Sequence, residues 1–161
     1  MSTPVPVSPG GVVGDYVPFY LAPRSPMLAA SYYGNVQGRT DGQDGIVYLV
    51  TTLDTVATRG GVVLTNKHPL KRPVFTDDPA RFEDDTFIDW EVMFDPWFTA
   101  TPTDTERPDR RQAEVLVHEA VAVESFVGIA TRTPADLARV QDCCIGSNVE
   151  WHFAERPDWY F

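Results

Sequence analysis

The segment best suited to chemistry is residues 110–117, which reads Arg-Arg-Gln-Ala-Glu-Val-Leu-Val and follows a loop rich in Pro, Thr and Asp. Its apolar alternation predicts a strand on which Ala113 and Val115 face one way and Glu114 and Leu116 the other. A carboxylate fixed near the start of a strand can stabilise positive charge that develops in a transition state.

Residue types alone leave two interpretations of Glu114 open. It could form a structural salt bridge with Arg110 or Arg111, which is the commoner situation for a carboxylate beside arginines. It could instead be a catalytic group held by the strand. The choice between them decides what the segment does.

Arg24 is the second candidate. It lies in the turn Ala-Pro-Arg-Ser-Pro at residues 22–26, where two prolines restrict the backbone. An arginine fixed in this way could recognise an anionic or planar group with little loss of entropy on binding. An ion pair with one of the chain's many carboxylates explains the residue equally well.

Six of the 13 basic residues fall in two short segments, which is notable in a chain of net charge −10. The overall charge argues against a general nucleic-acid binder, but a local basic lip on an acidic body remains compatible with it. Scattered charge on solvated loops explains the same pattern. The two segments contain Lys67, Lys71 and Arg72, and Arg107, Arg110 and Arg111.

Several other kinds of site lack support in the sequence. The three histidines and the adjacent Cys143 and Cys144 do not have a zinc spacing, and the acidic stretches at 77–78 and 83–85 do not match a calcium loop. No glycine-rich phosphate loop or nucleophile elbow is present. We therefore expect no metal site.

Composition indicates an ordinary globular protein. The 161 residues are 43% hydrophobic and 22% charged, which suits one domain with its own core. No stretch is apolar over the roughly 18 residues that a membrane span needs, and the N-terminus does not resemble a signal peptide. Adjacent cysteines fit a reducing compartment, so we expect a cytoplasmic protein. We also expect a monomer without membrane contact.

Local patterns predict a single α+β domain over residues 1–161, with residues 1–14 as a disordered lead-in. Short β-branched runs predict the strands, and capped amphipathic runs predict the helices. Thr76 or Asp77 is expected to cap a short helix at 75–80, and Thr133 the last helix. The expected strands are 17–21, 46–51, 62–65, 110–117 and 149–153, and the longer helices 52–59, 87–97 and 134–142.

Residues 15–28, Asp-Tyr-Val-Pro-Phe-Tyr-Leu-Ala-Pro-Arg-Ser-Pro-Met-Leu, resemble a block of the DarT-type DNA ADP-ribosyltransferases, the toxin half of bacterial toxin–antitoxin pairs. The resemblance continues, in the family's order, over nearly the whole chain. Its further blocks are 45–50, 75–80, 88–90, 110–117 and the Trp-Tyr-Phe ending at 159–161.

This resemblance implies an ADP-ribosyltransferase-like split β-sandwich that binds NAD⁺ as a substrate. Such enzymes transfer ADP-ribose to a base of single-stranded DNA, thymidine in the best-known subgroup. Glu114 matches the catalytic glutamate and Arg24 the essential arginine. A macrodomain antitoxin of the DarG type is the partner that the resemblance implies.

The remaining site residues follow from these two positions. We expect Tyr20, Arg24, Met27 and Tyr48 to contact NAD⁺, although core packing explains at least two of Tyr20, Tyr48 and Trp90 equally well. The family's DNA-holding loop corresponds to roughly residues 64–111, which carry both basic segments. The expected DNA contacts are Lys71, Arg72, Arg107, Arg110 and Arg111.

One departure from the family concerns the N-terminus. Residues 1–14 do not contain the His-x-Thr element that helps to seat NAD⁺ in other members, so we interpret the chain as an N-terminally shortened member whose activity is reduced or absent. The alternatives are a remnant that only binds NAD⁺ or single-stranded nucleic acid, and a related transferase acting on RNA or protein.

Overall fold

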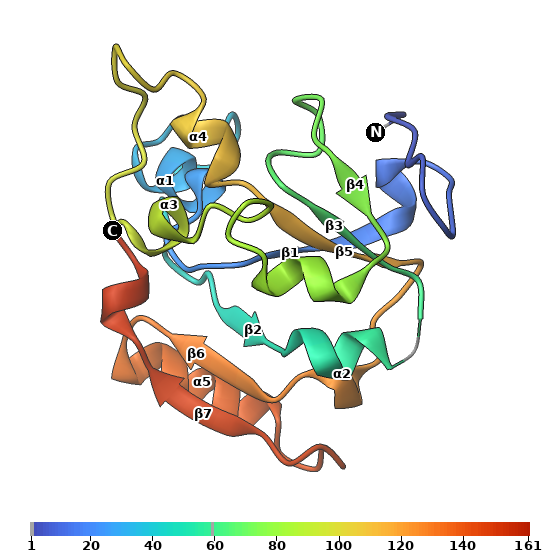
Figure 1. Ribbon diagram of the computed structural model, residues 1–161. Coiled ribbons are helices and arrows are strands. Elements are labelled where there is room, and N and C mark those ends of the chain that lie inside the picture. The colour runs from blue at the N-terminus through green and yellow to red at the C-terminus, as the bar shows by residue number, and fades with distance from the viewer. Residues whose placement is uncertain (1, 59) are drawn as a thin grey trace. The chain divides into compact units, whose positions relative to one another are not determined.

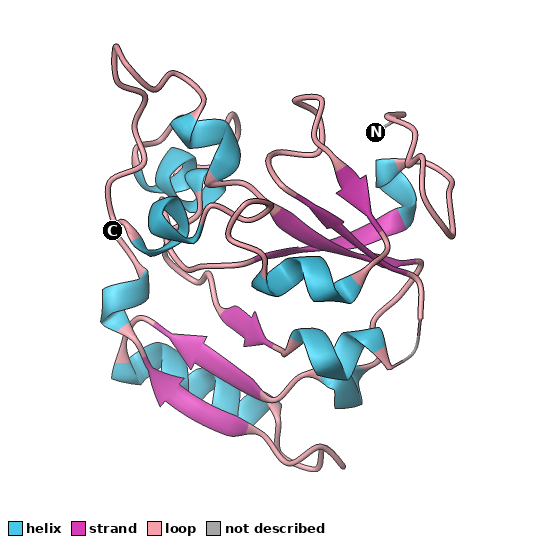
Figure 2. Ribbon diagram, in the orientation of Figure 1, coloured by secondary structure: helices cyan, strands magenta, loops and turns pink. Residues whose placement is uncertain are grey.

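The computed structural model describes residues 2–58 and 60–161. The chain divides into two compact units, of which the first comprises Met1–Pro26 and Val56–Val121 and the second Met27–Thr55 and Ala122–Phe161. Each unit combines strands with short helices, as Figure 2 shows. The predicted α+β class is therefore confirmed.

The first unit contains an antiparallel sheet that places the candidate residues. In spatial order its strands are β1 (Tyr16–Tyr20), β5 (Glu114–His118), β3 (Val62–Thr65) and β4 (Phe75–Thr76), as Figure 1 shows. In the β1–β5 pair, Tyr20 lies opposite Glu114 and Tyr16 opposite His118. The end of β1 and the start of β5 therefore meet at one edge of the sheet.

Strand β5 is central and buried on both faces. Its residues Glu114 to Val117 are all buried, which fits a strand paired on both sides. The predicted strand at 110–117 begins only at Glu114, because residues 107–110 form a short helix, α4 (Arg107–Arg110), with a proline in its first turn. Glu114 is consequently the first residue of the strand.

Short helices fill the segment between β4 and β5. They are η2 (Pro79–Glu83), α3 (Trp90–Phe94) and α4. Asp78 caps η2 by accepting a hydrogen bond from the Ala80 amide, so the predicted caps Thr76 and Asp77 were wrong by one or two residues. The aromatic helix expected at 87–97 is confined to α3, with Asp89 as its N-cap.

The stretch before β1 packs onto the first unit, contrary to the disordered lead-in that we expected. The Val5 amide donates to the Gly11 carbonyl at 3.0 Å, and the Val13 amide to the Thr3 carbonyl at 2.8 Å. Val5 and Val13 are buried in a hydrophobic cluster with three residues of the sheet. These residues are Tyr16, Val63 and Leu116.

The second unit has a mixed sheet of β2 (Tyr48–Val50), β6 (Gly128–Thr131) and β7 (His152–Glu155). β2 pairs antiparallel with β6, and β6 pairs parallel with β7 through the connecting helix α5 (Pro134–Cys143), which lies along this pair in Figure 1. Thr133 caps α5 as predicted. The remaining helical segments are η1 (Val13–Asp15), α1 (Pro26–Tyr32), α2 (Leu53–Ala57), η3 (Val123–Ser125) and η4 (Pro157–Trp159).

The C-terminal aromatic residues pack within this second unit. Tyr160 is 1% exposed, and its hydroxyl donates to the Ile46 carbonyl at 2.9 Å. The side chain of Gln43 bonds both the amide and the carbonyl of Phe161. Over the residues described, no helix is both long and apolar enough to cross a membrane.

Candidate functional site

Glu114 is a buried carboxyl group at the first residue of β5. Only 7% of the residue is exposed, and burial raises the pKa of its carboxyl from 4.5 to about 7. Neither neighbouring arginine pairs with it, because Arg110 binds other carboxylates and Arg111 binds a backbone carbonyl. The structure therefore does not support the salt-bridge interpretation of Glu114.

Two neighbouring strands hold Glu114 in place. On β3, the Thr65 hydroxyl accepts a hydrogen bond from the Glu114 amide at 3.1 Å, and this threonine is fully buried. On β1, Tyr20 is the cross-strand partner, and its pKa is raised to about 12, first by burial and then by the charge of Glu114. The carboxyl thus sits on a rigid platform in a poorly solvated environment.

Arg24 lies in the turn that leaves the same edge of the sheet, four residues after Tyr20. Its φ angle is 55°, in the left-handed region that residues other than glycine seldom occupy. Backbone strain of this kind concentrates at functional sites, where the surroundings must enforce it. One such restraint acts on the preceding residue, because Arg111 donates a hydrogen bond to the Pro23 carbonyl at 2.6 Å.

Arg110, predicted to bind DNA, is saturated by the protein's own carboxylates. It contacts Asp89 at 2.7 Å and forms a two-pronged pair with Asp104 at 3.0 and 2.7 Å. These contacts raise the pKa of Arg110 and lower that of the Asp104 carboxyl. Arg107 pairs similarly with Asp95 at 2.6 Å.

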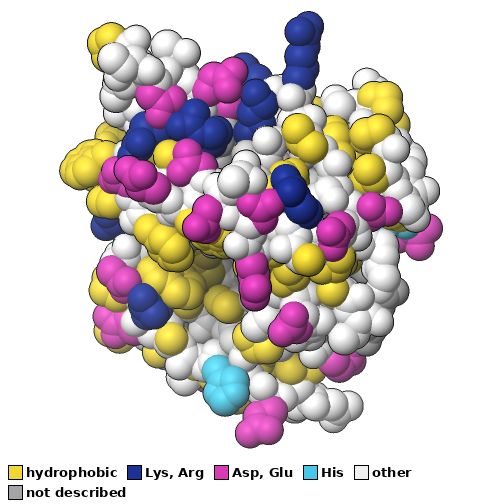
Figure 3. Space-filling model, in the orientation of Figure 1, with side chains coloured by type: hydrophobic (Ala, Val, Ile, Leu, Met, Phe, Trp, Pro, Cys, Tyr) yellow, Lys and Arg dark blue, Asp and Glu magenta, His cyan; other side chains and the backbone are white. Residues whose placement is uncertain are grey.

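Arg107 and Arg110 join α4 to the segment that precedes it, through Asp89, Asp95 and Asp104. Figure 3 shows Lys and Arg side chains interleaved with Asp and Glu in the area where Figure 1 places α4. Arg111 is 4% exposed, so its predicted role as a DNA contact does not agree with the structure. A buried guanidinium cannot meet a phosphate without rearrangement of the protein.

Lys71 and Arg72 differ from the α4 cations because they are exposed, and the ion pairs of the described residues do not include them. Phe94 is the last residue of α3, and Trp97 follows it before α4; they are 79% and 75% exposed. The Phe94 ring stacks on Trp90 with centroids 5.7 Å apart. Exposed stacked rings are surfaces on which nucleic-acid bases can stack.

The other predicted NAD⁺ contacts, Met27 and Tyr48, both belong to the second unit, and Met27 is exposed in the first turn of α1. The Tyr48 hydroxyl donates to the Trp159 carbonyl at 2.9 Å, and its ring packs edge-on against Trp159 and Tyr160. Its visible role is packing. Trp90 also packs, since its indole N–H donates to the Phe82 carbonyl at 3.1 Å.

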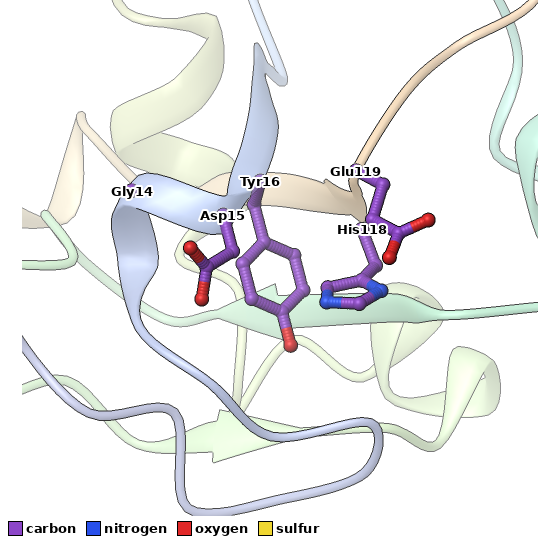
Figure 4. Close-up of a pocket in the computed structure, with 5 residues that line it drawn as sticks. All are labelled: Gly14, Asp15, Tyr16, His118 and Glu119. Atoms are coloured by element: carbon purple, nitrogen blue, oxygen red, sulfur yellow. The ribbon is translucent and has the colours of Figure 1, made fainter.

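An open hollow of about 410 Å³ lies at the opposite end of the β1–β5 pair. Figure 4 shows the Tyr16 and His118 side chains together there, with the carboxylates of Asp15 and Glu119 on either side in this view. The two rings pack edge to face, and the Tyr16 hydroxyl donates to the Gly10 carbonyl. This hollow lies at His118, four residues along β5 from Glu114, or roughly 13 Å. We assign the hollow no catalytic role.

Sequence reasoning missed Asp89 and Thr65, and it assigned Arg111 to DNA instead of to the Pro23 turn. Asp89 could have been identified from its place before α3, because aspartate is a favoured N-cap. The contacts of Thr65 with Glu114 and of Arg111 with Pro23 left no sequence signal, since each joins residues at least 49 positions apart. Among the described residues, no cluster of three or more His, Cys, Asp or Glu could hold a metal ion.

Comparison with known proteins gives this geometry a family. The family model described as "ssDNA thymidine ADP-ribosyltransferase, DarT" matches residues 2–161. A DNA ADP-ribosyl transferase from Thermus sp. (strain 2.9) is 32% identical, over 98% of this chain and 74% of the relative. One from Escherichia coli O127:H6 is 30% identical, over 98% of this chain and 72% of the relative.

Solved structures agree in fold. The chain is similar to Thermus sp. 2.9 DarT in complex with NAD⁺, with a TM-score of 0.89 and 30% identity over 98% of this chain and 78% of that one. The same relative in complex with ADP-ribosylated single-stranded DNA also gives 0.89, covering 99% of this chain and 75% of that one. These matches confirm the predicted ADP-ribosyltransferase fold.

The raised pKa of Glu114 predicts how its charge affects stability. Since the folded pKa lies above the unfolded one, this group contributes no penalty below pH 4.5 and lowers the free energy of unfolding as pH rises toward 7. The loss should reach about 3 kcal/mol above pH 7. We expect Glu114→Gln to be more stable than the wild type at pH 8, with a smaller difference at pH 5.

Urea unfolding of both proteins at pH 5 and pH 8 measures this difference. Groups that titrate alike in both proteins cancel, so the wild type minus variant difference isolates Glu114. A difference that does not change with pH would contradict a buried, hard-to-ionise carboxyl at this position.

Proposed function

This chain belongs to the DarT family of single-stranded DNA thymidine ADP-ribosyltransferases, and on that basis we propose that residues 1–161 act as one enzyme domain. It transfers ADP-ribose from NAD⁺ to a thymine base of single-stranded DNA. The observation that supports the proposal is that Glu114 is buried and does not pair with either neighbouring arginine. The turn that contains Arg24 leaves the sheet at the same edge. NAD⁺ is a substrate here.

Glu114 is proposed to act on the ribose of NAD⁺. Breaking the bond between the ribose and nicotinamide develops positive charge on the sugar. An ionised carboxylate close to that charge, and bonded to a ribose hydroxyl, stabilises the transition state more than the ground state. The low exposure of Glu114 strengthens this interaction, because little water screens it.

Arg24 is proposed to stabilise the negative charge that forms on the acceptor base. The ring nitrogen of thymine releases its proton to solvent water and attacks the ribose carbon, and the bond between that carbon and nicotinamide breaks as the new bond forms. An arginine remains protonated, so a charge-stabilising role suits it better than that of a proton acceptor. The constrained turn fixes the guanidinium before the substrates bind.

The substrate contacts are also proposals. Tyr20 lies opposite Glu114, and this pairing supports its proposed contact with NAD⁺. The proposed contact of Met27 rests on family membership. For DNA, we revise the earlier expectation to Lys71 and Arg72, with Phe94 and Trp97 as stacking surfaces. The exposure of these four side chains supports this choice over the paired cations of α4. A cytoplasmic monomer neutralised by a macrodomain antitoxin of the DarG type completes the proposal, which rests on family membership.

Activity should depend on the ionised form of Glu114. We expect kcat/KM for NAD⁺ to rise up to tenfold per pH unit below about pH 7 and to level off above it, because only the carboxylate stabilises the sugar cation. Glu114→Gln should lower kcat by about 10²–10³-fold. Transfer of labelled ADP-ribose to a thymidine-containing oligonucleotide measures both, and a fully active Gln variant would rule out the proposed function.

The exposed cations predict the salt dependence of DNA binding. Replacing both Lys71 and Arg72 with Gln should weaken binding of a single-stranded oligonucleotide. The slope of log K against log salt should become less negative by about 1.4, since each lost phosphate contact removes about 0.7. Fluorescence anisotropy from 50 to 300 mM salt, roughly spanning the sensitive range, measures the slope. Arg139→Gln, which alters another exposed cation in the second unit, is the control, and an unchanged slope in the double variant refutes these contacts.

The aromatic surface predicts a contribution that does not depend on salt. Trp97→Ala should weaken oligonucleotide binding by about 1–3 kcal/mol, the value of one stacked base. Its slope of log K against log salt should equal that of the wild type. Leu70→Ala removes another exposed apolar side chain and serves as the control. Equal affinities of Trp97→Ala and the wild type would exclude stacking at this position.

A further inference from the structure

Arg111 is buried, and among the described residues its contacts differ from those of the surface arginines. It is 4% exposed, and its guanidinium donates to the Pro23 carbonyl at 2.6 Å and to the Met93 sulfur at 3.7 Å. The same group lies 5.4 Å from the centroid of the Phe98 ring. One side chain thus joins the β1 exit turn, α3 and the start of β5.

Burying a guanidinium costs free energy, because its hydration must be replaced by protein contacts. An apolar side chain of similar length would fill this space with a smaller penalty, as substitutions of buried charges in other proteins show. Stability alone therefore gives a weak reason for an arginine at this position. Its specific contribution is a charge-assisted hydrogen bond to the backbone at Pro23.

The carbonyl group that accepts the hydrogen bond from Arg111 is part of the peptide bond between Pro23 and Arg24. The Pro23 carbonyl carbon is bonded to the Arg24 nitrogen, and it is this next residue that has the left-handed φ of 55°. Such a conformation persists only where surrounding contacts enforce it. Arg111 is also three residues before Glu114, so the segment that carries the carboxyl also fixes the turn that carries Arg24.

We infer that Arg111 is a positioning residue for the transfer reaction, which acts by holding the Pro23–Arg24 backbone so that Arg24 and Glu114 keep a fixed mutual geometry. This inference rests on the proposed catalytic roles of those two residues. It separates Arg111 from Arg110, whose carboxylate pairs tie α4 to Asp89 and Asp104 and do not touch the turn.

A double-mutant cycle with Arg24 tests the inference. Arg111→Gln removes the charged donor, and Arg111→Lys keeps the charge with a smaller head group. Arg24→Lys serves as the second site because it retains a cation and measurable turnover. Arg81→Gln is the matched control, since Arg81 also lies over a phenylalanine ring and pairs with a carboxylate, 2.6 Å from Asp84, within the same unit.

We expect Arg111→Gln to lower kcat by about 10- to 100-fold, the effect of a small displacement of a catalytic group. The KM for NAD⁺ should change much less than kcat, because Arg111 does not contact this substrate in the proposed mechanism. Arg111→Lys should fall between this variant and the wild type, and Arg81→Gln should match the wild type. In the Arg24→Lys background, Arg111→Gln should add little further loss, because the group it positions is already altered.

Circular dichroism and the thermal midpoint establish that each variant is folded before kinetics are compared. If Arg111→Gln loses the fold, Arg111→Lys carries the test in both backgrounds. Wild-type kcat in the folded Arg111 variants, or losses that multiply with Arg24→Lys, would overturn the positioning role. These results would leave the proposed function intact as long as Glu114→Gln is inactive, whereas an active Glu114→Gln rejects the function and this inference together.

Discussion

The antiparallel pairing of β1 with β5 is the constraint on which the candidate site depends. Because Tyr20 lies opposite Glu114, the chain leaves β1 at the edge where it enters β5. Two segments about 90 residues apart in the sequence are thereby brought together, one with the Arg24 turn and the other with the buried carboxyl. A shift of one residue in this register would turn Glu114 to the opposite face of the sheet.

The α4 segment supports this edge through its charges. Arg107 and Arg110 are neutralised by carboxylates of the preceding loop, while Arg111 turns inward to Pro23. Consecutive arginines thus have different partners because the end of a short helix directs them to different sides. Each such pair removes one positive and one negative charge, so the net charge of −10 is unchanged while the basic segment at 107–111 presents less positive charge than its composition indicates.

Sequence reasoning located β1, β2, β3, β5 and β7 within a few residues but did not predict β4 or β6, and it failed where long-range contacts decide. The run Val62–Thr65 and the capped helix after Thr133 are local patterns and were predicted closely. The start of β5 was not, because the predicted strand included residues 110–113, which the end of helix α4 and the turn after it occupy. The basic segment at 107–111 looked like a DNA surface because composition shows charges but not their partners.

The features that make this edge suitable for catalysis are also unfavourable for stability. A carboxyl that resists ionisation, a buried guanidinium and a left-handed arginine each raise the free energy of the folded state. All three occur within one short stretch of the β1–β5 edge, while Val63 and Leu116 belong to a buried apolar cluster of the same sheet. Costly features concentrated in this way are expected at functional sites and not at ordinary ones.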